Sequence, residues 1–353
     1  METMSFTKIN FRKFLALPVI CCSVFMMTGC DGNDDGGDDN GGGTNPDAAA
    51  RLYVSNDVTA GQLSIYDLNT DATLQAPKTV QTTANKGNGI AVAPISGHLF
   101  QVSRDERAIL VFADAAKLAD NATVTSKFKL TNVTNARDIA YDEANKLLYI
   151  SKPNDSTIHV FSDPLALTGE VAATKVLKLA GGKPWALHFD SKNNRLLVAL
   201  DEAARSIEVY NSPSSLTTGK VTPTASFKIA GASRLHGIAY SSAANALVVT
   251  DLGASTSATA TDGKIYIFDN ANTVLSGASG EISATRTITG NATNLLSGPV
   301  EVTIDDREGK NMIYVAEKSA NKILGFKLSD TGEAAATINV AANAPESVFL
   351  DIR

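Results

Sequence analysis

The chain has 353 residues, of which 6% are aromatic and 19% charged, and its formal charge is −6. Six aspartates fall within residues 31–47, so the rest of the chain is close to neutral and has no basic stripe. This balance argues against nucleic acid as a partner. The many small, β-branched and hydroxyl residues favour short strands and turns over helices.

Residues 1–29 have the pattern of a secretory signal. Lys8, Arg12 and Lys13 precede the apolar run FLALPVICCSVFMMTG, which is too short to span a membrane comfortably. The junction MMTGC resembles a bacterial lipobox, and the resemblance implies cleavage before Cys30 and acylation of Cys30. A cleaved signal followed by an unrelated cysteine is the alternative. Several acyl chains on one residue would anchor the mature protein stably to a membrane.

Residues 30–50 are expected to form a flexible tether. The stretch DGNDDGGDDNGGGTNPD has almost no apolar side chains and cannot bury enough surface to fold. It lacks the closing glutamate of an EF-hand. Cys21 and Cys22 would leave with the signal, so no disulfide or thiolate metal site is expected. We therefore expect a protein of the bacterial cell envelope, lipid-anchored and either periplasmic or surface-exposed, with the choice between inner and outer membrane open.

Beyond the tether, one pattern of about 48 residues recurs. The strand that opens each unit reads GIAVAP (89–94), DIAYD (138–142), ALHFD (186–190), GIAYS (237–241), EVTID (301–305) and SVFLD (347–351). Two nearly continuous apolar strands and a more polar fourth strand follow each opener except the last. Such a sheet is buried on both faces and needs a neighbouring sheet on each side, which a radial arrangement supplies. The repeat therefore predicts a β-propeller.

The two ends of the repeat complement one another. The region begins with the second, third and fourth strands of a unit (51–55, 62–67 and 78–83) and ends with an unpartnered opener, ESVFLDIR. Joining them predicts an all-β, six-bladed propeller over residues 51–353, with four antiparallel strands per blade and a C-terminal strand that closes the N-terminal blade. We expect it to be monomeric. Two unrelated β-sandwiches are the alternative, but they do not explain the complementary ends.

The turns FSDPLALTG (161–169) and FDNANTVLSG (268–277), together with the blade pattern, resemble the six-bladed propellers of the NHL and gluconolactonase-like superfamily and also YVTN-type surface propellers. This resemblance implies the fold and a ligand site on the face where the first strands begin. It does not imply one activity, because this architecture hosts lyases, lactonases and binding modules.

A ring of side chains is expected at that face. Two residues before the aligned apolar position of each opener stand Asn88, Arg137, Trp185, His236, Val300 and Glu346. Asp138 and Glu301 follow in the chain, and Asp251 ends a second strand beside the long loops 251–263 and 290–299. A concave face with a few converging polar groups is the default place for a ligand. Polar residues that merely line a water-filled channel are the alternative reading. The candidate ligand-binding residues are Asn88, Arg137, Asp138, Trp185, His236, Asp251, Glu301 and Glu346.

Two main functions follow. The preferred one is a non-catalytic module that binds a protein partner or a small-molecule ligand at this face. The alternative is a metal-dependent, lactonase-type hydrolase, since gluconolactonase-like enzymes hold a divalent metal with Glu, Asn and Asp. The nearest matches here, GPVEV with Glu301 and APESV with Glu346, are out of order. Any metal would be calcium or magnesium on the oxygens of Glu301, Glu346 and Asp138. No catalytic residue is assigned, and an assembly scaffold that uses the blade sides remains a third option.

Overall fold

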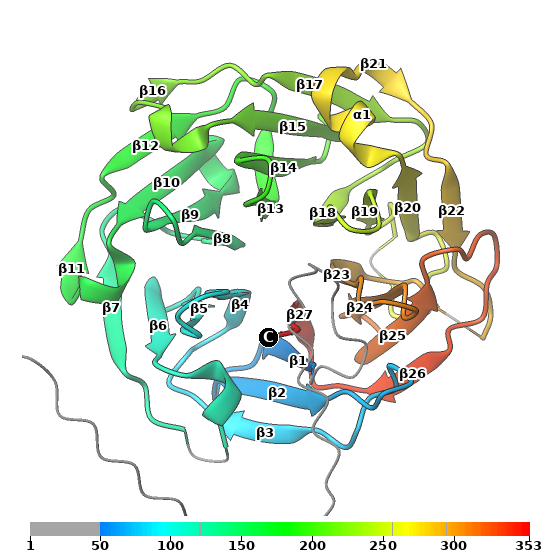
Figure 1. Ribbon diagram of the computed structural model, residues 1–353, viewed down its shortest axis with the longest axis horizontal. Coiled ribbons are helices and arrows are strands. Elements are labelled where there is room, and N and C mark those ends of the chain that lie inside the picture. The colour runs from blue at the N-terminus through cyan, green and yellow to red at the C-terminus, as the bar shows by residue number, and fades with distance from the viewer. Residues whose placement is uncertain (1–49, 120–121, 256, 294) are drawn as a thin grey trace, which may run out of the picture. The chain divides into compact units, whose positions relative to one another are not determined.

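Six antiparallel sheets form a ring in the computed structural model, which describes residues 50–119, 122–255, 257–293 and 295–353 (Figure 1). The expectations for the signal, for Cys30 and for the tether up to residue 49 lie outside these residues. The strands of each blade are named from the channel outward. Blade 1 consists of β27 (Pro345–Asp351), β1 (Arg51–Asn56), β2 (Gln62–Asp67) and β3 (Lys78–Gln81), and blade 2 of β4 (Gly87–Val92), β5 (Leu99–Ser103), β6 (Ala108–Phe112) and β7 (Ser126–Leu130). Blade 3 consists of β8 (Ile139–Asp142), β9 (Leu147–Lys152), β10 (Thr157–Ser162) and β12 (Lys175–Lys178).

The remaining three blades follow the same order from the channel outward. They are blade 4, β13 (Lys183–Asp190), β14 (Arg195–Asp201), β15 (Ser206–Asn211) and β17 (Ala225–Ile229); blade 5, β18 (Leu235–Ser241), β19 (Ala246–Asp251), β20 (Lys264–Asp269) and β22 (Arg286–Thr289); and blade 6, β23 (Pro299–Asp305), β24 (Met312–Glu317), β25 (Lys322–Lys327) and β26 (Ile338–Ala341). The predicted six-bladed, all-β propeller is therefore confirmed.

Blade 1 closes the ring as the sequence predicted. The C-terminal strand β27 pairs antiparallel with β1, and Tyr53 and Val54 face Phe349 and Val348 in the ladder. Both ends of the repeat thus belong to one sheet, and the alternative of two separate sandwiches is wrong.

The hydrophobic core is divided into six clusters, one between each pair of neighbouring blades. The inner strands supply these clusters from both faces, which is why their sequences are continuously apolar. The outer strands instead alternate between buried and exposed residues, as β17 shows along its whole length. Burial of one large side chain such as Phe227, which is 1% exposed, contributes about 1.5–3 kcal/mol.

Short additional strands on three blades depart from the predicted four. They are β11 (Gly169–Val171), β16 (Gly219–Lys220) and β21 (Ser279–Ile282), and each pairs in parallel with the outermost strand of the preceding blade. Each blade thereby covers the free edge of its neighbour, and free edges otherwise invite pairing with other chains. These segments are too short and polar to be recognised from periodicity.

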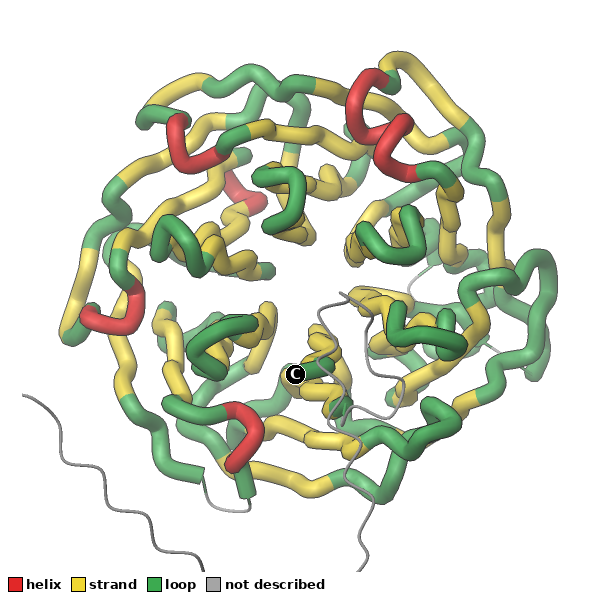
Figure 2. The backbone as a smooth tube through the Cα atoms, in the orientation of Figure 1, coloured by secondary structure: helices red, strands yellow, loops and turns green. Residues whose placement is uncertain are grey.

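The helical segments are short. They are η1 (Ala115–Lys117), η2 (Pro153–Asp155), η3 (Pro164–Ala166), η4 (Pro213–Ser215) and α1 (Ala271–Gly277), so the stretch expected as a turn at 268–277 contains a helix. Figure 2 shows most of them toward the outside of the ring, with strands around the channel. Among the residues described, no helix is long and apolar enough to cross a membrane.

Candidate functional site

β-bulges position the predicted ring of side chains. The register of the first strand shifts at its start in blades 1, 2, 4, 5 and 6. A bulge leaves a residue out of the ladder and re-aims its side chain. The residues skipped by these ladders include Asn88, Trp185, His236, Val300 and Glu346. With Arg137, which directly precedes Asp138 and β8, they form what we call the mouth ring.

Three flat side chains of the mouth ring stack on one another. Trp185 lies between Arg137, whose guanidinium carbon is 4.5 Å from the indole centroid, and His236, whose ring centroid is 4.0 Å away at an interplanar angle of 22°. A guanidinium over an indole face is an attractive arrangement. Burial lowers the pKa of His236 although Asp201 lies 3.3 Å from its Nε2 atom. The imidazole is therefore neutral at pH 7, and its Nδ1 atom has no partner among the described residues.

Ion pairs engage the remaining charges of the mouth ring. Glu346 pairs with Lys318 and lies 3.7 Å from the guanidinium of Arg137. Lys318 also binds Asp57, which in turn lies 3.3 Å from Arg104. Glu346 is thus held among cations, which leaves its carboxylate little capacity to bind a further positive charge.

The stacked and paired side chains leave only a water-sized space at this face. That space has a volume of about 10 Å³ and is lined by Asn88, Gly89, Arg137, Asp138, Trp185, Val300, Glu301, Glu346 and Ser347. A volume of this size holds about one water molecule. Six of the eight predicted site residues therefore meet here, and His236 supports Trp185 within the same stack. That a ligand binds at this face stays a prediction.

Asp251 does not join the site. Its carboxylate is fully buried and accepts N–H bonds from Ser233 and Arg234, at 2.8 and 2.7 Å. It therefore fixes the loop before β18 instead of facing a ligand. The two long loops expected beside Asp251 contact one another. Gly263 of the first loop donates its N–H to the carbonyl of Leu296 in the second, at 3.0 Å.

Asp138 and Glu301 form a buried carboxyl pair at the waist of the channel. Both line the small space at the mouth ring and also a larger cavity beyond it. Asp138 accepts the N–H of Leu187 at 2.7 Å, and Glu301 Oε1 accepts those of Val302 and Ile238 at 3.0 and 3.2 Å. Burial raises the pKa of Asp138 to about 7. Burial also raises the pKa of Glu301 well above its usual range, and the neighbouring Asp138 adds to that rise.

Glycines of the neighbouring blades make room for the pair. A Cβ atom on Gly89 would lie 2.6 Å from the Cα atom of Asp138, and one on Gly237 would lie 2.7 Å from the Cα atom of Glu301. Each acidic residue therefore packs directly against a backbone that carries no side chain.

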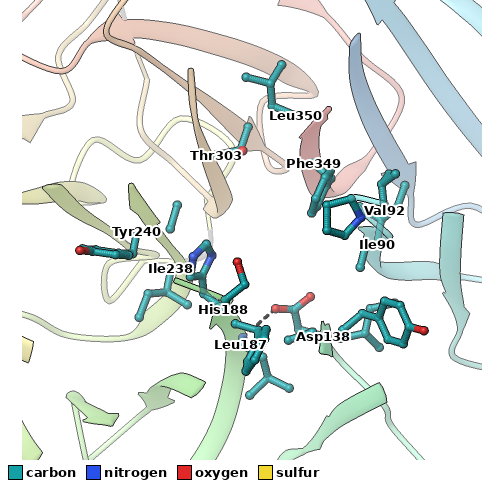
Figure 3. A pocket seen from close by; sticks show the side chains of 18 of the residues that line it. Ile90, Val92, Asp138, Leu187, His188, Ile238, Tyr240, Thr303, Phe349 and Leu350 are labelled. Carbon is teal, nitrogen blue, oxygen red and sulfur yellow. Dashed lines mark hydrogen bonds between the residues drawn. The ribbon is translucent and has the colours of Figure 1, made fainter. Parts of the chain in front are cut away.

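The larger cavity, which we call the channel cavity, has a volume of about 750 Å³. It extends from the carboxyl pair to the loops that follow the first strands, at the end of the channel away from the mouth ring. Figure 3 shows Asp138 and its bond to Leu187 in this cavity, with aliphatic and aromatic side chains around them. The labelled lining residues include Ile90, Val92, Ile238, Tyr240, Phe349 and Leu350.

The channel cavity was not predicted from the sequence. Its walls are the first strands themselves, whose apolar residues the repeat explains as core. The sequence feature that could have indicated the cavity is the presence of polar residues, His188 and Thr303, within these otherwise apolar strands. Both line the cavity and are only partly buried. Burial lowers the pKa of His188 to about 4, so its ring carries no charge near neutral pH.

Comparison with known proteins gives the family. Residues 43–236, somewhat more than half of the chain, match the family described as "Lactonase, 7-bladed beta-propeller". The chain belongs to this lactonase propeller family. Its description names seven blades, whereas this lactonase-family propeller closes with six sheets among its described residues. No curated protein matches the chain.

A solved structure supports the fold of this lactonase-family propeller. It is similar to a chain from "Crystal structure of Nidogen/Laminin Complex", with 12% identity, a TM-score of 0.59, and coverage of 86% of this chain and 98% of that one. At this identity the likeness shows the β-propeller fold alone. The finer resemblance to NHL and YVTN-type propellers stays a prediction.

The carboxylates of this family member do not match a divalent-metal centre. No group of three or more His, Cys, Asp or Glu side chains arranged to hold a metal occurs within the described ranges. Glu346 already has Lys318 as a partner, and Asp138 and Glu301 accept backbone N–H bonds. The expectation of calcium or magnesium on Asp138, Glu301 and Glu346 therefore receives no support from their arrangement.

Proposed function

We propose that this propeller is a non-catalytic binding module that takes a small molecule into the channel cavity. The observation that carries the proposal is the cavity itself. Its volume of about 750 Å³ lies within the range of small-molecule sites. Its walls are mainly apolar, and the Asp138 and Glu301 carboxyls supply the few polar groups that would orient a ligand. A small molecule is preferred over a protein partner because the mouth ring is filled by its own side chains.

The proposed setting is the bacterial cell envelope. The sequence of residues 1–29 and the lipobox-like junction at Cys30 support export and lipid anchoring. An anchored binding module would hold its ligand close to the membrane surface, in the periplasm or outside the cell.

The alternative function is lactone hydrolysis at the same carboxyl pair. The family match and the two adjacent acids with raised pKa values favour it. An ionised carboxylate would take a proton from water as the water oxygen bonds to the lactone carbonyl. A protonated partner would then donate its proton to the ring oxygen as the ring C–O bond breaks, which yields a hydroxy acid.

A cavity-filling variant tests the proposed function. Thr303 lines the channel cavity and is labelled in Figure 3, so Thr303→Trp places an indole inside it. Thr79→Trp on the exposed edge strand β3 is the matched control. The probe is 4-phenylbutan-1-ol, followed by saturation-transfer NMR at concentrations up to about 10 mM. We expect binding to the parent and the control, and loss in Thr303→Trp.

Absence of probe binding to the parent, or binding that survives Thr303→Trp, would reject the channel cavity as the site. The alternative is measured on the same proteins with δ-valerolactone as substrate. Turnover that disappears in Asp138→Asn and in Thr303→Trp would make the protein an enzyme, whereas probe binding without turnover supports a binding module.

A further inference from the structure

The charged residues that line the channel cavity are all acidic. Of the described residues that line it, none is a lysine or an arginine, whereas five carry carboxyl groups: Asp138, Asp142, Glu143, Glu301 and Asp306. The one histidine of the lining, His188, is neutral near pH 7 because burial lowers its pKa to about 4. The lining therefore offers negative charge and hydrogen-bond acceptors, with no cation to balance them.

The carboxylates near the cavity rim are held by neutral donors alone. Asp142 accepts N–H bonds from the backbone and side chain of Asn145, and Glu143 accepts those of Ile95 and Ser96. None of the five lining carboxylates forms an ion pair with a described residue. Their negative charge is thus left to act on whatever occupies the cavity.

At the base of the cavity one oxygen atom lacks a partner. Glu301 is 7% exposed, and both of its hydrogen bonds use Oε1. Its Oε2 atom accepts no hydrogen bond from a described residue. The Oε2 atom of Glu301 is therefore free to accept a hydrogen bond from a donor in the cavity.

The cations close to the channel are engaged outside the lining of the cavity. Arg137 and Lys318 belong to the mouth ring and its ion pairs, where Glu346 binds both. Arg195 lies 4.8 Å from the Tyr240 ring centroid, outside the lining, and pairs with Asp190 at 2.8 Å. These three cations thus have carboxylate partners outside the cavity lining, whereas the lining carboxylates form no ion pair with a described residue.

The geometry points to an organic cation as the ligand: an ammonium group that donates to Glu301 and Asp138, on an aliphatic or aromatic body that packs against the first strands. This assignment rests on the proposed function, since it names the ligand class of the same cavity. An ammonium group supplies the donors that the free oxygen lacks and offsets the negative lining. The apolar body matches walls such as Ile90, Ile238 and Phe349. An anionic ligand would meet five carboxylates and no cation, so the cavity selects against acids and phosphates.

Three probes of one shape separate the ligand class from simple apolar binding. They are 4-phenylbutylamine, 4-phenylbutan-1-ol and 4-phenylbutanoate, compared by calorimetry at about pH 8 and low salt, where the amine is protonated and the pH lies above the Asp138 pKa of about 7. We expect the amine to bind at least about tenfold more tightly than the alcohol, and the carboxylate more weakly than either. Glu301→Gln should reduce the advantage of the amine over the alcohol to about threefold or less. Glu170→Gln, an exposed carboxyl on β11, is the matched control and should leave that advantage unchanged.

The possible outcomes distinguish failure of the cationic ligand class from failure of the proposed small-molecule binding function. Alcohol binding that equals amine binding and is lost in Thr303→Trp would overturn the cationic class and leave the proposed function standing. Amine binding that survives Thr303→Trp would place the amine elsewhere and overturn this inference. Failure of all three probes to bind would overturn both. If Glu301→Gln does not fold, Asp138→Asn serves in its place, because the amide oxygen can still accept the Leu187 N–H.

Discussion

At the scale of single residues, the channel separates two kinds of environment. Trp185, the only tryptophan of the chain, sits between a guanidinium and an imidazole and fills the mouth ring. Asp138 and Glu301 lie at the waist, where burial keeps protons on their carboxyl groups to higher pH than in water. The first arrangement closes one end of the channel, and the second gives the other end its acidic base.

The pKa of Asp138 predicts how stability depends on pH. Because its pKa rises from 3.8 in the unfolded chain to about 7 in the folded protein, the folded state favours the protonated acid. The stabilisation is therefore complete below about pH 4 and is lost as the pH rises through about 7. Asp138→Asn mimics the protonated acid and should exceed the parent in stability at pH 8 by on the order of a few kcal/mol.

Thermal unfolding at about pH 4 and pH 8 checks this prediction, with the exposed Glu170→Gln as control. We expect the parent and Asp138→Asn to converge at the lower pH. An equal difference between them at both values would show that the carboxyl of Asp138 is not desolvated.

A second residue-scale prediction distinguishes the two ends of the channel. Trp185 lines the small space at the mouth ring and does not line the channel cavity. Trp185→Ala should therefore leave the affinity for 4-phenylbutylamine within about twofold of the parent. Calorimetry measures it, and a loss of about tenfold or more would return the ligand site to the mouth ring, where the sequence placed it.

At the scale of elements, close approach between first strands fixes the carboxyl pair. Gly237 in β18 lies against the backbone of Glu301 in β23, and Gly89 in β4 lies in the same way against Asp138 before β8. Side chains at these glycines would push neighbouring blades apart near the waist. The bulges at the strand starts then direct the mouth-ring residues away from the ladder.

Gly237→Ala is expected to destabilise the protein by about 1–3 kcal/mol, because the added methyl group meets Glu301 and the Thr250 hydroxyl at 2.7 Å. Gly277→Ala at the end of α1 meets nothing within 4 Å and should be neutral or slightly stabilising. Urea unfolding of the two variants makes the comparison. Equal stability of both would mean that the first strands can separate without cost.

The elements that the sequence predicts are those whose own residue pattern determines them, whereas the others depend on contacts with a neighbouring blade. The six openers were recognisable because burial on both faces writes a continuous apolar run into each strand. The partial strand Gly169–Val171 was not, because its pairing depends on a neighbouring blade and not on its own pattern. The mouth-ring positions followed from the repeat, but the stacking of Trp185 between Arg137 and His236 did not, since register alone does not give side-chain directions. The local role of Asp251 was not predicted, because a carboxylate at a strand end serves a loop as readily as a ligand, and its hydrogen bonds come from Ser233 and Arg234.

At the scale of the whole propeller, the seam between β1 and β27 completes the ring. Val348 and Leu350 of β27 belong to the hydrophobic cluster between blades 6 and 1, together with Leu52 and Val54 of β1. Without β27, that cluster and one edge of β1 would face water.

Deletion of Glu346–Arg353 should therefore lower the thermal midpoint of the entire propeller by more than about 10 °C or prevent folding. Deletion of Arg353 alone, which removes mainly its ion pair with Asp351, is the control and should cost about 1 kcal/mol or less. Circular dichroism follows both. A native-like midpoint after the longer deletion would show that five blades and an open sheet suffice.

The seam also bears on the timing of folding during synthesis. The strand β1 pairs with β27, which is the last strand described. This pairing can therefore form only when nearly the whole chain has been synthesised. Blades 2 to 5 can assemble as they emerge, whereas the first sheet stays incomplete, with an unprotected edge, to the end. Nascent chains therefore cannot close this sheet until translation is nearly complete.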